Sequence, residues 1–118
     1  MNREALFADE TEDYRIPAEP EEGEEVCLRF RTLKGGIDRV FFIRLNKGIQ
    51  VRMNRRSSDS LFDYYEYRMT LGEEPEFFYF RAEEDGGETC CYNRLGAVDS
   101  AGWDYAFRIG YPAGSFSV

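Results

Sequence analysis

The sequence predicts an all-β fold in which two antiparallel sheets, with seven or eight strands in total, pack face to face. Two observations carry this prediction: apolar and polar residues alternate with a period of two in several short segments, and turn signals recur about every ten residues. A 3.6-residue helical period is absent, apart from a turn expected between Arg3 and Ala8. The pattern is typical of an immunoglobulin-like β-sandwich, and a closed barrel with the same strand count is the alternative.

The first half of the chain supplies four of the expected strands. A short edge strand is expected at 13–16 and an amphipathic strand at 25–32. The segment 39–45 is apolar on both faces, which favours a position inside a sheet. A turn at 46–48 and the alternation that follows at 49–54 predict a hairpin with that strand.

The central block of the chain, 59–93, predicts three successive strands after a loop at 55–60. Turns are expected at 72–75 and at 85–87, where Asp-Gly-Gly supplies the positive φ that a tight hairpin needs. In the middle strand of this block, alternate residues face the core and the solvent. The outward set keeps aromatic side chains beside its charges, which is more apolar surface than a solvated face needs.

The last part of the chain predicts one closing strand. Residues 95–102 are glycine-rich and irregular, and Tyr105, Phe107 and Ile109 alternate with more polar neighbours. A chain of 118 residues is one domain, which can bury roughly two thirds of its unfolded surface. We therefore expect a sandwich module at 1–110 and a linker at 111–118.

The charge distribution argues against two classes of partner. Residues 1–25 carry ten acidic and two basic side chains, whereas the rest of the chain is neutral. Proteins that bind nucleic acid usually carry a stripe of basic residues, and proteins that bind an anionic membrane surface carry basic residues too. We therefore expect no nucleic acid and no membrane among the partners.

The start of the chain and the cysteines predict a cytoplasmic location. No signal-peptide h-region is present, and no segment approaches the roughly 20 apolar residues that cross a bilayer. Cys27, Cys90 and Cys91 are an odd number, and two of them are neighbours, so we expect reduced thiols with a structural role.

Catalytic and metal-binding motifs are missing from the sequence. The chain has no histidine, no phosphate loop and no metal-ligand spacing, so we expect no cofactor, no metal and no catalytic residue. Carboxylate pairs such as Asp63 with Glu66, or Glu83 with Asp85, remain a minor glycosidase alternative. The glutamate run at 21–25 suggests a solvated loop rather than a calcium loop, because it lacks the EF-hand spacing.

Aromatic side chains beside polar groups are the chemistry that remains. The apolar face of a sugar ring stacks on an aromatic ring, while its hydroxyls pair with carboxylates, amides and arginine. Simple packing is the competing interpretation for each of these rings. The candidates for carbohydrate binding are Trp103 with Asp104 and Tyr105, and the outward-facing Tyr64, Phe77 and Tyr79.

An ordered set of segments resembles a known family. The segments are Glu25–Thr32, Gly36–Val40, Leu61–Glu66, Phe77–Phe80 and Asp85–Thr89. In this order and spacing they resemble the amino-terminal module of neopullulanases, cyclomaltodextrinases and maltogenic amylases, which is classed as carbohydrate-binding module family 34. The resemblance covers about residues 4–109.

The resemblance implies a β-sandwich that precedes the (β/α)₈ barrel of a family 13 glycoside hydrolase. Such a barrel needs about 250 residues, so the family's three catalytic carboxylates have no counterpart in this chain. The parent enzymes cleave α-glucosidic bonds of starch, pullulan or cyclodextrins. In the family the module also packs across a homodimer and walls the partner's active-site cleft. That role would fall to the turn of Asn46, Lys47, Gly48 and Ile49.

Two functions follow as hypotheses. The first is a non-catalytic module that binds or positions α-glucans such as starch, maltooligosaccharides or cyclodextrins. The alternative is a purely structural domain for dimerisation and docking, without sugar affinity of its own. An independent adhesion domain is a distant third, since no export signal is present.

Overall fold

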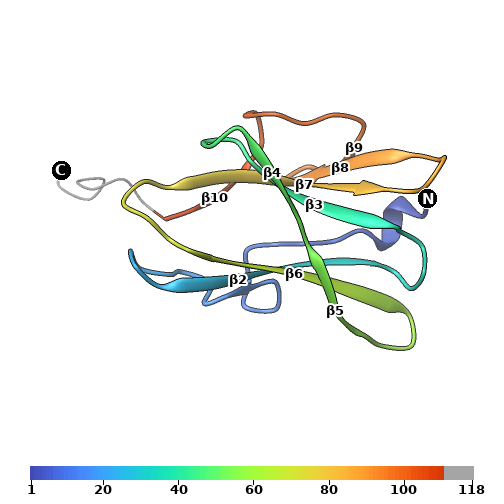
Figure 1. The fold of residues 1–118 in the computed structure, drawn as a ribbon, viewed down its shortest axis with the longest axis horizontal. Helices are drawn as coiled ribbons and strands as arrows, with labels where there is room; N and C mark the ends of the chain where they lie inside the picture. Colours follow the sequence, from blue (N-terminus) through green and yellow to red (C-terminus); the bar gives the residue numbers. More distant parts are fainter. Residues whose placement is uncertain (111–118) are drawn as a thin grey trace.

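The computed structural model describes residues 1–110 and forms a two-layer antiparallel β-sandwich. Figure 1 shows the two sheets as an upper and a lower layer. The all-β prediction is confirmed, and the segment 111–118, expected to be a linker, lies outside the described residues. The elements are η1 Arg3–Ala5, β1 Arg15–Ile16, β2 Glu25–Leu33, β3 Arg39–Arg44, β4 Ile49–Arg52, β5 Asn54–Ser58, β6 Phe62–Thr70, β7 Glu76–Glu83, β8 Thr89–Asn93, β9 Gly96–Val98 and β10 Phe107–Ile109.

The two sheets have different sizes. Sheet A has the strand order β1-β2-β6-β5, and sheet B has the order β4-β3-β7-β8-β9. Strand β10 also belongs to sheet B, where it pairs with the first half of β7 while β8 pairs with the second half. The predicted hairpins β3–β4 and β7–β8 are both present, the latter with Gly86 at φ +65°. The connection 71–75, in contrast, carries the chain from sheet A to sheet B.

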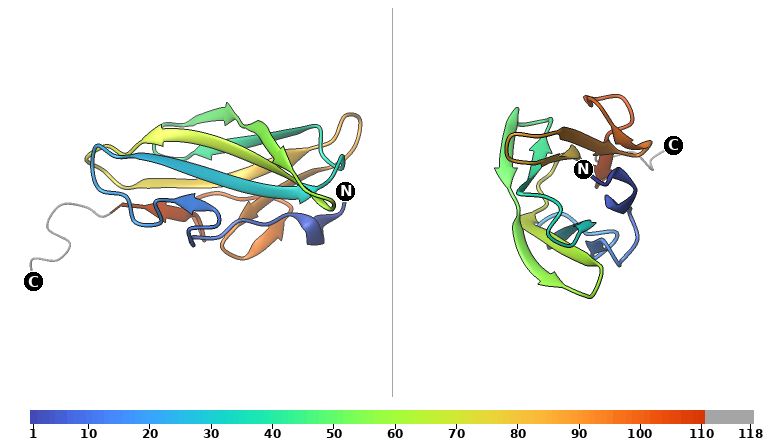
Figure 2. Two further views of the ribbon diagram at one scale, coloured as in Figure 1. Left: turned by 90° about the horizontal axis from the view of Figure 1, so that it is seen from below. Right: turned by 90° about the vertical axis from the view of Figure 1, so that its right-hand side faces the viewer.

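Within the described residues, two strands were missed by the sequence prediction. Strand β5 was expected to be a loop, and β9 lies in the segment expected to be irregular. Strand β5 is an edge strand with every residue exposed, so it has no apolar alternation to reveal it. Met53, between β4 and β5, is buried and donates its N–H to Val40 O at 2.8 Å. The ribbon of β4 and β5 therefore passes from one sheet to the other along one side of the molecule (Figure 2).

The core lies between the sheets and is built from alternating aromatic residues. Phe78 and Phe80 of β7 point inward, as the alternation predicts. The Phe80 ring stacks on Phe30 of β2 at 4.8 Å between centroids, and Phe78 lies 4.7 Å from Phe42 of β3. The three cysteines are buried and form no disulfide within the described residues, and their structural role stays a prediction.

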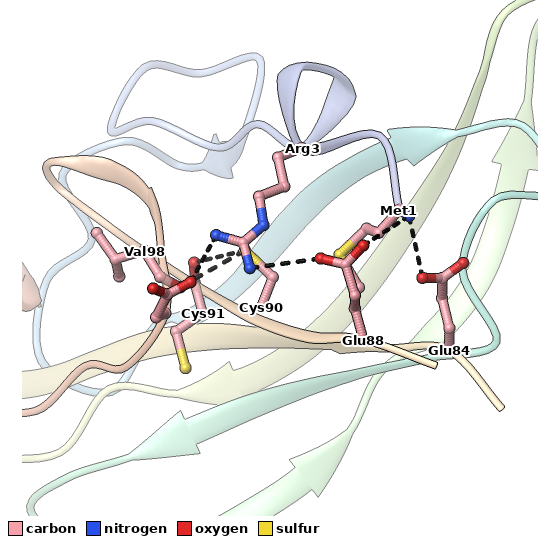
Figure 3. A network of polar contacts seen from close by, with 8 residues as sticks. Met1, Arg3, Glu84, Glu88, Cys90, Cys91 and Val98 are labelled. Carbon is pink, nitrogen blue, oxygen red and sulfur yellow. Dashed lines mark hydrogen bonds and ion pairs between the residues drawn. The ribbon is translucent and has the colours of Figure 1, made fainter. Parts of the chain in front are cut away.

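The amino-terminal segment is fastened to the sandwich by ion pairs. The ammonium group of Met1 lies 3.1 Å from both Glu84 and Glu88, near the turn of the β7–β8 hairpin. Arg3 continues this network by donating from Nη1 to Asp99 at 2.8 Å, and Figure 3 shows the contacts together. Leu6 then reaches the core. The first residues therefore pack as part of the domain.

Candidate functional site

The outward face of sheet B carries a row of partly buried apolar side chains. Across the centre of this face, Ile43 of β3 is paired with Tyr79 of β7, and Phe41 is paired with Arg81. The Arg81 guanidinium lies over the Phe41 ring at 4.9 Å. Burial raises the pKa of the Tyr79 phenol above its ordinary value, and Cys91 acts in the same direction. The face combines apolar rings with a cation that lies over one of them.

Trp103 extends this row from the loop between β9 and β10. The loop rises above the outer side of sheet B (Figure 1). The Trp103 ring lies 5.5 Å from the Phe77 ring at an interplanar angle of 53°, and the residue is 58% exposed. Phe77 is half-buried and has the same parity on β7 as Tyr79. We call Phe41, Phe77, Tyr79 and Trp103 the aromatic face.

The loop that holds Trp103 has a defined backbone. Ala106 donates its N–H to Trp103 O at 3.3 Å, and Arg94 donates its N–H to Tyr105 O at 3.0 Å. Tyr105 has φ +60°, a left-handed conformation that few side chains adopt, which is why the closing strand begins only at Phe107. Asp104 is exposed on the same loop, beside the aromatic face.

The structure separates Tyr64 from the other predicted sugar-binding residues. Tyr64 is on β6 and points outward from sheet A, so it lies on the opposite side of the sandwich. Its hydroxyl donates to Asp59 Oδ2 at 2.9 Å. Hydrogen bonds from the N–H groups of Leu61 and Phe62, and then from Tyr64, lower the pKa of Asp59. Tyr64 thus supports the loop before β6, and it is not part of the aromatic face.

The predicted cleft turn lies at the border of the aromatic face. The turn is closed by Gly48, which donates its N–H to Leu45 O at 3.3 Å and has φ +64°. The Asn46 side chain accepts from Phe77 N–H at 2.6 Å and donates to Pro75 O at 3.0 Å. Lys47 and Gly48 are exposed, and so is Ile49, at 47%. The turn predicted for the dimer cleft and the aromatic residues predicted for sugar binding are therefore neighbours.

The sequence prediction did not single out three residues of this region, namely Phe41, Arg81 and Gln50. Arg81 donates from Nη2 to Gln50 Oε1 at 2.6 Å, which places an amide and a guanidinium at the border of the rings. The sequence did hold a signal for an apolar outer face, namely the segment 39–45. A strand that is apolar on both faces either is covered on both sides or presents apolar surface to the solvent.

The structure places the carboxylate pairs considered for catalysis in two different settings. Asp63 points into the sandwich and Glu66 points outward, so the two carboxyl groups do not face each other. Glu83 and Asp85 share Arg39, at 3.2 Å and 2.5 Å. Within residues 1–110, no group of acidic or sulfur ligands could hold a metal ion, and no helix is long and apolar enough to cross a membrane.

The comparisons with known proteins address the whole domain. Residues 1–113 match the family model described as "Alpha amylase, N-terminal ig-like domain". The structure is similar to a cyclomaltodextrinase, with a TM-score of 0.77, 24% identity, and coverage of 95% of this chain and 20% of that one. It is also similar to the type III pullulan hydrolase from Thermococcus kodakarensis, with a TM-score of 0.60, 10% identity, and coverage of 87% and 16%.

At these identities, the two structural matches support the fold, and this chain spans at most a fifth of either protein. No curated protein matches the chain significantly. The family model, in contrast, covers nearly the whole sequence. The chain therefore belongs to the family of N-terminal immunoglobulin-like domains of alpha-amylases.

Proposed function

We propose that this chain is a non-catalytic module of an α-amylase-family glycoside hydrolase, and that it binds or positions α-glucans on the aromatic face. The observation that carries the proposal is the exposed Trp103 ring inclined against Phe77, with Tyr79 next along the same side of β7. Successive glucose units present apolar C–H faces that can contact such rings. Their hydroxyls would meet Asp104 and Gln50 at the border of the face.

The parent enzyme is the second part of the proposal. The matched proteins are named for action on cyclomaltodextrins and pullulan, both α-glucans. We propose that the parent hydrolyses α-glucosidic bonds, with its catalytic carboxylates on a (β/α)₈ barrel outside this chain. In that arrangement the module would present the substrate to the barrel and would perform no chemistry itself. The cytoplasmic location remains a prediction from the sequence.

A docking and dimerisation domain is the second candidate function. It is favoured by the position of the exposed 46–49 turn, which is joined to the aromatic face by the hydrogen bond from Phe77 N–H to Asn46 Oδ1. A face of partly exposed rings can pack against the parent's barrel or against a second copy as well as against a sugar. In that case the rings would be covered by protein in the complete enzyme.

Calorimetric titration of the domain with maltoheptaose distinguishes the two functions. Glucan binding predicts a dissociation constant in the millimolar range or tighter, and a roughly fivefold to thirtyfold weakening in Trp103→Ala if the lost contact contributes about 1–2 kcal/mol. Leu61→Ala is a matched control, because Leu61 is equally exposed but lies before β6 in sheet A. Absence of binding at millimolar sugar would leave the docking function.

A further inference from the structure

A pocket of about 820 Å³ opens at the end of the aromatic face. It lies between the glutamate-rich segment 18–22, the connection 71–74 and strand β10. Phe77 lines it too, so one ring belongs both to the pocket and to the aromatic face. The volume is within the range of about 300–1,000 Å³ that small-molecule sites occupy.

Arg15 gives this pocket an unusual lining. The residue is only 5% exposed, and within residues 1–110 its Nε and Nη2 have no hydrogen-bond partner, although its guanidinium carbon lies 5.8 Å from the centroid of the Phe78 ring. Its remaining nitrogen, Nη1, makes one long contact of 3.5 Å to Glu10 Oε2, which is half exposed. Burial lowers the pKa of Arg15, and the nearby Glu10 offsets part of that effect. Within the described residues, two of the three guanidinium nitrogens of this buried cation therefore make no hydrogen bond.

A buried cation with unused hydrogen-bond donors is costly to the fold. Removing hydrogen-bond partners from a buried charged group costs more than replacing the whole group by an apolar one of similar shape. The two unpaired nitrogens are covered by protein atoms, whereas Nη1 lies toward Glu10, and Arg15 and Glu10 both line the pocket. We therefore assign the ligand contact to Nη1. An acceptor arriving there would gain a charge-assisted hydrogen bond in a partly desolvated site.

The other charges of the pocket define the class of ligand. Six glutamates and three arginines line it, so the excess of negative charge disfavours an anion. The acidic residues do not form a metal-binding group. A neutral polyol suits this lining, because its hydroxyls accept from arginine and donate to carboxylates.

We propose that the pocket takes the terminal glucose unit of a linear α-glucan whose next units lie on the aromatic face, and that Arg15 donates from Nη1 to a hydroxyl of that unit. The inference rests on the proposed function, which it deepens from glucan binding to recognition of chain ends. The shared ring of Phe77 provides the continuity between the two subsites.

Linear and cyclic glucans separate this inference from the proposed function. Maltoheptaose has chain ends and β-cyclodextrin has none, although both offer seven glucose units for stacking. Calorimetry of the wild-type domain should give a preference of about tenfold for the linear sugar, the size expected for one charge-assisted hydrogen bond. Arg15→Met should abolish the preference while leaving β-cyclodextrin binding and the unfolding midpoint unchanged, or should raise the midpoint.

A second variant keeps the test valid if Arg15→Met does not fold. Gly72 lines the pocket, its φ is not left-handed, and a Cβ placed there would meet nothing within 4 Å. Gly72→Phe should therefore obstruct the pocket and remove the linear preference, whereas Gly72→Ala should keep it. Arg68→Met controls for the loss of a positive charge, because Arg68 is exposed on sheet A and bound to Glu25.

Each outcome has one meaning. Equal wild-type affinities for the two sugars, or a preference that survives both Arg15→Met and Gly72→Phe, would overturn the chain-end inference and leave glucan binding intact. No binding of either sugar at millimolar concentration would overturn the proposed function, and the inference with it.

Discussion

Replacing Asn46 by alanine should destabilise the domain and should also weaken sugar binding at the aromatic face. The Asn46 side chain accepts from Phe77 N–H at 2.6 Å and donates to Pro75 O at 3.0 Å, so it joins the β3–β4 turn to the start of β7. At about 0.5–1.5 kcal/mol for each net hydrogen bond, Asn46→Ala should lower the free energy of unfolding by about 1–3 kcal/mol. Maltoheptaose binding should also weaken, because the backbone of Phe77 loses the hydrogen bond that positions it.

A second substitution separates the two hydrogen bonds. Asn46→Asp keeps an acceptor for Phe77 N–H but turns a carboxylate oxygen toward Pro75 O, where the donor is lost, so it should lower stability while the Phe77 amide stays protected. Lys47→Ala is the control in the same exposed turn and should stay within about 0.5 kcal/mol of wild type.

Urea unfolding at neutral pH measures these differences, and hydrogen exchange of the Phe77 amide reports the local effect. Asn46→Ala with wild-type stability and unchanged protection of the Phe77 amide would refute the reasoning.

Three further predictions concern stability and reactivity. Hydrogen bonds with Glu88 and then Glu84 raise the pKa of the Met1 amine, and the amine in turn lowers the pKa of Glu88. The stabilisation that this ion pair gives to the fold should therefore be complete between the unfolded-state pKa values of 4.5 and 8.0 and should decline below and above that window. Thermal unfolding measured across pH should show this dependence in the wild type and a flatter one in Glu88→Gln. Tyr105→Asn should stabilise the domain by about 0.5–1 kcal/mol relative to Tyr105→Ala, since asparagine tolerates φ +60° better; equal unfolding free energies would argue against strain there. Burial raises the pKa of all three cysteine thiols, so Ellman's reagent should react with them only after unfolding, and a fast reaction in the native state would contradict their burial.

Strand alternation made most of the fold predictable from the sequence. The inward Phe78 and Phe80 were identifiable because the period of two is uninterrupted along β7. Strand β5, Asn54–Ser58, could not be identified, because an exposed edge strand has no buried side that would impose an apolar alternation. The turn signal at 72–75 could not distinguish a hairpin from a crossover between sheets, since both need the same local bend.

The candidate site was predictable only in part. Parity placed Tyr64 and Tyr79 on outward faces, but it could not assign them to different sheets. The contact between Asn46 and Phe77 spans 31 residues, and it depends on how β3 and β7 pair. Arg15 is a single charged residue in a two-residue strand, and nothing in its local sequence marks it as buried.

The central claim is that α-glucan binds the outer face of sheet B, and an NMR titration of the ¹⁵N-labelled domain with maltoheptaose tests it most directly. We predict shift changes at the amides of β7, β10 and the loop that carries Trp103, with the amides of β2 and β6 unchanged. The claim would be contradicted if no amide shifted at millimolar sugar, or if the changes were confined to sheet A.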